Sequence, residues 1–298
     1  MAEAGKPGSD PASRDATIAD SDAMIAETII HGADSPLSCA VTERDRDVMQ
    51  MVRRALKSGH ACLAFQPVVH ARDTARVAFQ EGLIRLMDHT GRVIPAREFI
   101  TVTETSELGR LIDTRALELG LAALQRFPAL RLSINMSARS IGYPEWKAAL
   151  TRAIKTDPTL AERLILEITE SSAMLMPDLV SVFMRDLQRV GVSFALDDFG
   201  AGYTAIRHFK DFYFDILKID GQFIRGVHAD PDNQVLVQAM VSIARHFDMF
   251  SVAEFVEDQR DADFLARVGV DCLQGYLFGA PTTKPPFVAR MDRRQLRA

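Results

Sequence analysis

The chain has 298 residues, of which 47% are apolar and 25% are charged, a composition that excludes global disorder and supplies enough apolar material for a sizeable core. The net charge of −5 comes from residues 1–40, which hold two basic and seven acidic residues, whereas the remainder is neutral. No basic face is indicated, so we expect no binding to duplex nucleic acid through its phosphates.

Neither a membrane segment nor a disulfide framework is indicated. No apolar run reaches the roughly 18 residues of a membrane span, and the N-terminus lacks the basic-then-apolar order of a signal peptide. We therefore expect a cytoplasmic protein with no membrane span. The three cysteines, Cys39, Cys62 and Cys272, form no CxxC pair, so a disulfide framework or a zinc-thiolate site is not expected.

The acidic N-terminal segment differs in composition from the rest of the chain. Residues 1–42 are rich in Gly, Pro, Ser and acidic residues, and we interpret them as a flexible acidic leader. A short apolar piece in it, Met24 to Ile30, is a candidate docking segment for a protein partner. Residues 43–285 contain no second linker and are expected to form one domain, and residues 286–298 a solvated tail.

Short apolar runs alternate with longer helical patterns along the domain. The runs expected to be strands are Ala61–Val69, Val77–Leu86, Arg131–Met136, Arg163–Thr169, Val192–Asp197, Phe214–Asp220, Met249–Phe255 and Asp271–Tyr276. The segments expected to be helices are Ile112–Arg126, Pro144–Lys155, Pro177–Val190, Pro231–Phe247 and Asp258–Val268, several of which begin with Pro or an acidic residue.

This alternation predicts an α/β fold, a (β/α)8 TIM-like barrel with one irregular connection. Only seven residues, His70 to Arg76, separate the first two strands, whereas a parallel crossover needs roughly a dozen. The first strand should therefore run antiparallel to the second.

Polar residues lie at the ends of nearly all the predicted strands, where an apolar barrel interior gives them no structural reason to be. Each one alone is explained by solvation or helix capping, but their recurrence indicates a site. They are Glu81, Asn135, Glu167, Asp197, Asp198, Lys218, Asp220, Glu254 and Gln274.

Oxygen ligands without a nearby cysteine or HxH pair favour Mg2+ or Mn2+ over zinc. Glu81, Asn135, Glu167 and Asp197 are the expected ligands of one ion, and Asp198 would reach a second. Two ions about 4 Å apart activate a water and neutralise a phosphoryl group during in-line displacement. Lys218 would hold the water or offset phosphate charge, and Glu254 would accept a proton or bind metal.

Two local features beside the expected ligands have alternative interpretations. Gly200 and Gly202 suggest a mobile catalytic loop, because the third glycine of a dinucleotide-binding loop is missing. Glu170, just past its strand, either caps the next helix or braces the loop after Asp198.

The ordered motifs over residues 45–285 resemble the EAL-domain family of cyclic di-GMP phosphodiesterases. The motifs are FQPVV, EGLIR, PAREFI with Glu104, SINMS, LEITES, LDDFGAGYTAI, LKIDGQFI, AEFVE and QGYLFGAP. The resemblance implies a barrel with an antiparallel first strand that cleaves cyclic di-GMP to linear pGpG with Mg2+ or Mn2+. Family members often dimerise, so a homodimer is one expectation.

The resemblance also implies residue roles. It makes Glu81, Asn135, Glu167 and Asp197 metal ligands, with Asp198 on a second metal. Lys218 resembles the lysine near the attacking water, Glu254 the general base, and Glu170 the residue that steadies the loop. For the substrate, Arg85 resembles the arginine that contacts phosphate, Gln274 matches a conserved-motif glutamine, and Gln66 and Pro281 fall where the family lines the dinucleotide groove.

Three motifs depart from the family pattern. Gly82 replaces the central residue of the tripeptide that gives the family its name, and Phe255 stands where the usual EGVE has glycine. Strand alternation predicts that both point outward to the helix layer, so Gly82→Ala should be mild and Phe255 should be buried under helices. In the loop after Asp198, Ala201, Thr204 and Ala205 replace residues that are frequently Thr, Ser and Ser.

Three functions fit these motifs. The leading hypothesis is an active phosphodiesterase, because all the expected carboxylates are present. The alternative is a catalytically silent EAL module that binds cyclic di-GMP or a protein partner as a signalling receptor. A barrel phosphohydrolase for another substrate is a third.

Overall fold

The computed structural model describes residues 35–88, 90–202 and 212–288. The chain divides into two compact units, Met1–Gln50 and Met51–Ala298, and the boundary falls inside helix α2 (Pro36–Lys57). The domain boundary expected at residues 42 and 43 thus lies within a continuous helix. The leader up to residue 34, with its apolar piece Met24 to Ile30, and residues 289–298 of the tail lie outside the described residues.

The second unit is a closed mixed barrel, as predicted. Its strands are β1 (Ala61–His70), β2 (Asp73–Met87), β4 (Leu132–Asn135), β5 (Leu164–Thr169), β6 (Ser193–Phe199), β7 (Ile216–Ile219), β8 (Phe250–Ala253) and β9 (Cys272–Gln274). They follow the order β1-β9-β8-β7-β6-β5-β4-β2, and pairing of β1 with β2 closes the ring. The sequence did not indicate a further short strand, β3 (Val93–Pro95). It pairs antiparallel with the last residues of β2.

The antiparallel first strand is confirmed. β1 pairs antiparallel with both β2 and β9, while β2 and β4 to β9 run parallel to one another. The turn is tighter than the apolar pattern suggested, because His70 already pairs with Asp73. The polar residues of 73–76 belong to an exposed extension of β2, which hydrophobicity alone does not reveal.

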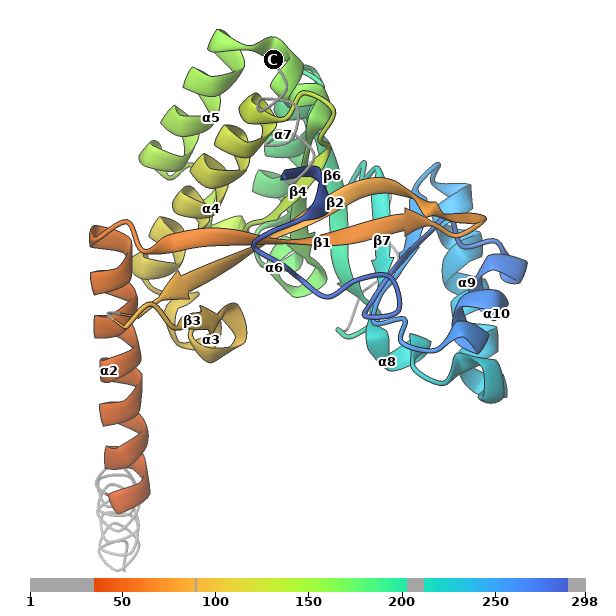
Figure 1. Cartoon of the computed structure of the whole chain (residues 1–298), viewed down its shortest axis with the longest axis horizontal. Coiled ribbons are helices and arrows are strands. Elements are labelled where there is room, and N and C mark those ends of the chain that lie inside the picture. The colour runs from red at the N-terminus through yellow and green to blue at the C-terminus, as the bar shows by residue number, and fades with distance from the viewer. Residues whose placement is uncertain (1–34, 89, 203–211, 289–298) are drawn as a thin grey trace, which may run out of the picture. The chain divides into compact units, whose positions relative to one another are not determined.

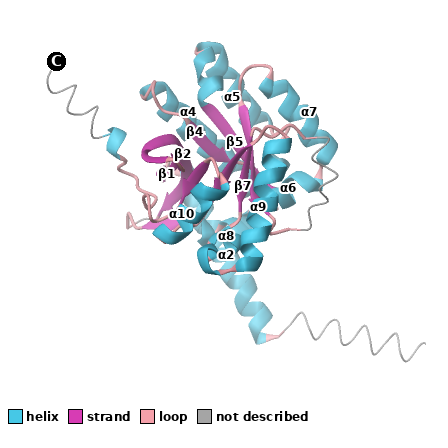
Figure 2. Cartoon of the chain, turned by 90° about the vertical axis from the view of Figure 1, so that its right-hand side faces the viewer, coloured by secondary structure: helices cyan, strands magenta, loops and turns pink. Residues whose placement is uncertain are grey.

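Helices cover the strands on the outside (Figures 1 and 2). The predicted helices correspond to α4 (Glu107–Arg126), α5 (Pro144–Thr156), α7 (Pro177–Gln188), α9 (Pro231–His246) and α10 (Gln259–Val268). Proline at the first position begins α5, α7 and α9, and Asp230 and Asp258 cap α9 and α10 through their side chains. Shorter helices are α3 (Ile100–Thr103), α6 (Glu170–Leu175) and α8 (Gly221–Ile224).

Two glycines, one in α4 and one in β2, lie against the side chain of Ile134. A Cβ on Gly120 of α4 would lie 2.9 Å from Ile134 Cδ1, and a Cβ on Gly82 of β2 would lie 2.7 Å from the same atom. Gly82 therefore faces the helix layer, as strand alternation predicted. The space on that side is already filled by Ile134.

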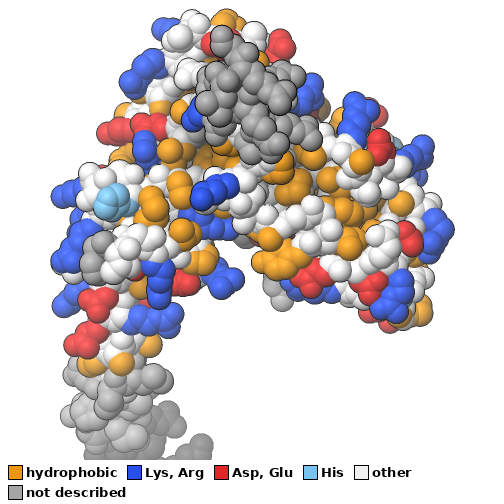
Figure 3. All heavy atoms as spheres, viewed as in Figure 1, with side chains coloured by type: hydrophobic (Ala, Val, Ile, Leu, Met, Phe, Trp, Pro, Cys, Tyr) orange, Lys and Arg blue, Asp and Glu red, His pale blue; other side chains and the backbone are white. Residues whose placement is uncertain are grey.

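Apolar side chains fill one level of the barrel interior. Seven strands contribute to this cluster of Val68, Phe79, Ile165, Ala195, Ile216, Val252 and Cys272. Polar side chains collect nearer the carboxyl ends of the parallel strands. No helix among the described residues is long and apolar enough to cross a membrane. In the view of Figure 3, basic and acidic side chains are interspersed over the surface.

Candidate active site

The parallel strands bring the predicted acidic residues to one end of the barrel. Asn135 pairs with Glu167 across β4 and β5, and Asp197 of β6 lies opposite Thr169 at the end of β5. Glu254 directly follows β8. Glu167 is fully buried and Asp197 and Glu254 nearly so, which is unusual for carboxylates unless they are paired or bind metal.

Lys218 of β7 lies among these carboxylates. Its Nζ is 2.7 Å from Glu167 Oε2, 2.8 Å from Asp197 Oδ1 and 2.8 Å from Glu254 Oε1. A further carboxylate oxygen, Oε2 of Glu81, is 3.8 Å away. One ammonium group therefore faces four carboxylates, and the cluster needs protons or additional cations to balance its charge.

The pKa shifts follow from this imbalance. Burial raises the pKa of Glu167 to about 8 in spite of the Lys218 charge, and it also raises the pKa of Glu254 well above the usual carboxyl range. Burial alone would lower the pKa of Lys218, but the carboxylates around it, above all Asp197, hold that pKa well above its usual value. These shifts favour the charged form of Lys218 and the protonated form of Glu254 in the absence of metal.

Glu81 accepts hydrogen bonds from two amides. Asn135 Nδ2 donates to Glu81 Oε1 at 2.7 Å, and Gln274 Nε2 donates to Glu81 Oε2. Although burial acts to raise its pKa, the charge of Lys218 and these two donors lower the pKa of Glu81 overall. Gln274 also donates to Gln66 Oε1 at 3.3 Å, which ties the first strand to the site.

The neighbouring Asp198 lies at a strained point of the backbone. Its φ is 55°, a left-handed value that is uncommon for residues other than glycine. Burial and the adjacent Asp197 charge raise the pKa of Asp198 to about 6. The turn brings its carboxylate beside Asp197 and Glu254, so that one oxygen from each of the three lies within 4.8 Å of the others.

This donor set fits a divalent cation. Besides the three close carboxylates, Glu167 Oε1 is buried and has no hydrogen-bond partner among the described residues. An unpartnered buried carboxylate oxygen is costly unless a cation or water satisfies it. Because all the donors are oxygens, the chemistry suits Mg2+ or Mn2+.

A pocket of about 330 Å3 opens onto the cluster. Its lining includes nine residues that the sequence singled out: Gln66, Glu81, Arg85, Asn135, Asp197, Asp198, Glu254, Gln274 and Pro281. Glu167 and Lys218 lie behind this lining, in contact with its carboxylates. A larger cavity of about 810 Å3, between the β1–β2 hairpin and residues 278–287, has no carboxylate in its lining.

Glu170 lies beside the pocket rather than in its lining. Its Oε2 accepts a hydrogen bond of 2.9 Å from Gly200 N, in the turn after Asp198. Thr169, not Glu170, caps α6 through its side chain. This geometry supports the bracing interpretation, in which Glu170 acts as a positioning residue and not through contact with substrate.

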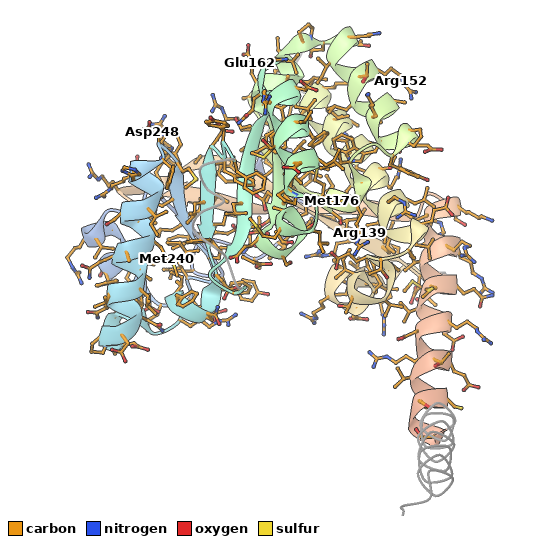
Figure 4. The ribbon with its side chains drawn as sticks, turned by 180° about the vertical axis from the view of Figure 1, so that it is seen from behind. Arg139, Arg152, Glu162, Met176, Met240 and Asp248 are labelled. Atoms are coloured by element: carbon orange, nitrogen blue, oxygen red, sulfur yellow. The ribbon has the colours of Figure 1, made fainter. Side chains whose placement is uncertain are left out.

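The same turn packs against two helices. Gly200 has a φ of 95°, and a Cβ there would lie 2.6 Å from Phe223 of α8 and 2.9 Å from Met240 of α9, a residue labelled in Figure 4. Of the motif departures noted in this loop, Ala201 is described, whereas Thr204 and Ala205 lie outside the described residues.

The prediction that Phe255 is buried under helices is wrong. The side chain is 45% exposed and belongs to the pocket lining. Strand β8 ends at Ala253, and the backbone turns at Phe255 to a φ of 54°, so strand alternation no longer applies at this position.

Sequence analysis missed four further residues of the pocket lining. They are Leu83, Glu257, Gly275 and Tyr276. Leu83 lies two residues after Glu81 on β2, so spacing along the strand could have found it. Gly275 and Tyr276 directly follow β9, which ends at Gln274, so strand spacing gives no signal for them.

Comparison with known proteins agrees with this geometry. The EAL domain family model matches residues 49–281. The chain is 30% identical over 238 residues to the cyclic di-GMP phosphodiesterase PdeF of Escherichia coli. The matched region covers 78% of this chain and 32% of PdeF. It is 26% identical over 247 residues to the cyclic di-GMP phosphodiesterase PdeB of Shewanella oneidensis, covering 82% of this chain and 29% of PdeB. The chain thus spans about a third of the length of these relatives.

A solved structure shows the same fold. The PaMucR phosphodiesterase in complex with c-di-GMP superposes with a TM-score of 0.69 at 28% identity, over 79% of this chain and 97% of that one. The closed barrel, the acidic cluster at its end and the extent of the family match lead to one conclusion: the chain belongs to the EAL domain family.

Proposed function

We propose that this barrel is a metal-dependent phosphodiesterase that hydrolyses cyclic di-GMP to linear pGpG. The observation that carries the proposal is the group of Asp197, Asp198 and Glu254 oxygens within 4.8 Å of one another at the floor of an open pocket. The relatives named as cyclic di-GMP phosphodiesterases and the c-di-GMP complex of PaMucR support the choice of substrate.

The metal site is proposed to hold two Mg2+ or Mn2+ ions. Glu81, Asn135, Glu167 and Asp197 would hold one ion, with Asp198 reaching the second, and Glu254 is close enough to contribute an oxygen. When bound, such ions supply charge neutralisation at the phosphoryl group and a water of lowered pKa.

The protein's own groups perform the remaining tasks. Lys218, held positive by its neighbours, offsets negative charge that develops beside Glu167 and Asp197. Glu254 is the candidate proton acceptor once a bound cation has lowered its pKa into the ionised range. Arg85 and Pro281 in the pocket lining are candidate contacts for phosphate and base, and Gln66 and Gln274 order the wall of the groove.

The test is product analysis with matched variants. Purified protein is incubated with cyclic di-GMP and either Mg2+ or Mn2+, and pGpG is separated by chromatography. Asp197→Asn and Glu167→Gln should each lower turnover at least a hundredfold, whereas Asp186→Asn on the exposed surface of α7 should leave it unchanged. Binding of cyclic di-GMP without turnover in either metal would contradict the proposal and favour a silent receptor.

Several expectations from the sequence stay predictions. They are the cytoplasmic location, the homodimer, the partner of the acidic leader, and the division into residues 1–42, 43–285 and 286–298.

A further inference from the structure

Phe255 adopts a backbone conformation that bulky residues rarely take. Its φ of 54° lies in the left-handed region, where a side chain with a Cβ crowds the following carbonyl. Such outliers persist only where the surroundings hold them in place, and they cluster at functional sites. The backbone preference of phenylalanine therefore does not explain why this residue stands at position 255.

Burial of the ring does not supply that explanation. Phe255 is 45% exposed, so much of its aromatic surface still faces solvent. The exposed part belongs to the lining of the pocket that also contains Glu254 and Asp198. An apolar ring thus stands directly beside the carboxylates of the candidate active site.

The ring is fixed in this place from α8. Arg225, the residue that ends α8, places its guanidinium carbon 4.4 Å from the ring centroid in a cation–π contact. Gly221, at the start of α8, makes room for the ring, since a Cβ there would lie 2.7 Å from Phe255 Cγ. The ring is therefore preorganised, and a ligand that uses it loses little side-chain entropy.

The pocket lining contains both charged and apolar side chains. Besides the carboxylates, of which Asp197, Asp198 and Glu254 lie close together, it contains Phe255, Leu83, Tyr276 and Pro281. A nucleotide would match both kinds of group once divalent cations occupy the carboxylates, since its phosphate requires cations and its base presents a flat apolar face.

We propose that Phe255 is a specificity-determining residue whose exposed ring stacks on a purine base of the dinucleotide substrate. The inference rests on the proposed function, because it takes the phosphate of the same substrate to lie at the carboxylates. The inference gives Phe255 a role in substrate binding, although strand alternation predicted that its side chain points away from the substrate.

The experiment compares Phe255→Gly and Phe255→Tyr with a control on β8, the strand that ends two residues before Phe255. Phe255→Gly removes the ring and suits the left-handed backbone, so the variant should fold. Phe255→Tyr keeps the ring. Phe250→Ala removes an aromatic side chain that is 65% exposed at the opposite end of β8.

Binding is measured by calorimetry with Ca2+, whose looser coordination supports binding better than chemistry, and kcat and KM are measured with Mg2+. Phe255→Gly should weaken binding of cyclic di-GMP about tenfold and raise KM to a similar degree with kcat little changed. Phe255→Tyr and Phe250→Ala should stay within about twofold of wild type, well below the loss expected for a missing stacking contact.

A second comparison isolates stacking from a purely structural effect. Pyrimidine bases offer less surface, so wild type should prefer cyclic di-GMP to cyclic di-UMP more strongly than Phe255→Gly does. Equal preference in the two proteins, or tighter binding by Phe255→Gly, would overturn the inference and show that the ring obstructs the pocket. Failure of wild type to bind cyclic di-GMP at all would instead remove the proposed function, and the inference with it.

Discussion

The ammonium group of Lys218 lies 2.7 Å from the carboxylate of Glu167, and neither side chain has appreciable contact with solvent. Lys218 is the lone cation that the described residues place within 4.0 Å of the Glu81, Glu167, Asp197 and Glu254 carboxylates. The proposed metal site and the stability of the barrel are therefore linked through this lysine.

Replacing Lys218 with methionine should destabilise the metal-free protein. The change keeps most of the length of the side chain, which becomes one heavy atom shorter, but leaves buried carboxylates without their cation, at a cost of about 3 kcal/mol or more. Thermal unfolding in a chelator measures the loss, and Lys147→Met on the exposed face of α5 is the matched control. Similar melting temperatures for the two variants would show that the carboxylates are neutralised by protons instead.

Divalent metal should stabilise the wild-type fold, because a ligand that binds only the folded state raises the melting temperature with concentration. At about one hundred times its dissociation constant, Mn2+ should contribute about 2.7 kcal/mol. Asp197→Asn should lose most of that increase, whereas Asp186→Asn should keep it. An equal increase in both variants would place the metal elsewhere.

Gly82→Ala should destabilise the barrel, contrary to the mild effect expected from the sequence. The new methyl would lie 2.7 Å from Ile134 Cδ1, and overpacking of about 1–3 kcal/mol outweighs the roughly 0.5–1 kcal/mol that alanine contributes within a strand. Denaturant unfolding gives the net change.

Ile134→Val provides the control for that prediction. It removes the crowded Cδ1 atom and should cost about 1 kcal/mol alone. If the added methyl collides with Ile134 Cδ1, the variant that carries both Gly82→Ala and Ile134→Val should lose about 1 kcal/mol less unfolding free energy than the two single losses added together. Simple additivity would mean that the barrel absorbs the methyl in another way.

Asp113 of α4 should make stability depend on pH. Burial raises its pKa to about 7, against the hydrogen bonds it accepts from Ser140 Oγ and Ser137 N. The folded state therefore binds the proton more tightly than the unfolded chain, whose pKa is near 3.8. This contribution is fully present below about pH 4, declines as pH rises to about 7, and is absent above that.

Asp113→Asn removes this titration and keeps an oxygen for both donors, which bond to the same atom, Oδ2. The free energy of unfolding of Asp113→Asn minus that of wild type should increase by about 2–4 kcal/mol from pH 5 to pH 8, as measured by denaturant unfolding. A constant difference across that range would show that Asp113 is ionised throughout.

The sequence predicted the barrel and most of the site because both depend on short-range patterns. Glu81, Glu167 and Asp197 interrupt apolar runs within their strands, and parallel pairing of neighbouring strands brings such positions together without further information. The structure differs from the prediction where a residue lies beyond a regular strand or packs against a residue distant in sequence. Alternation fails at Phe255 because β8 ends at Ala253, and the crowding at Gly82 depends on Ile134, which is distant in sequence.

Because β1 runs opposite to the parallel strands, the chain enters the barrel at the end that carries the acidic cluster. Ala61 pairs with Leu86, beyond Glu81 in the direction of the carboxyl ends, and five residues later Gln66 pairs with Glu81 itself. In a regular parallel barrel the entry would lie at the opposite rim, about one strand length of 17–20 Å away. Here a displacement of residues 58–60 would act along one hydrogen-bonded strand on Gln66, the partner of a proposed metal ligand, Glu81. The inverted strand therefore gives a short mechanical connection from residues 58–60 to the proposed active site.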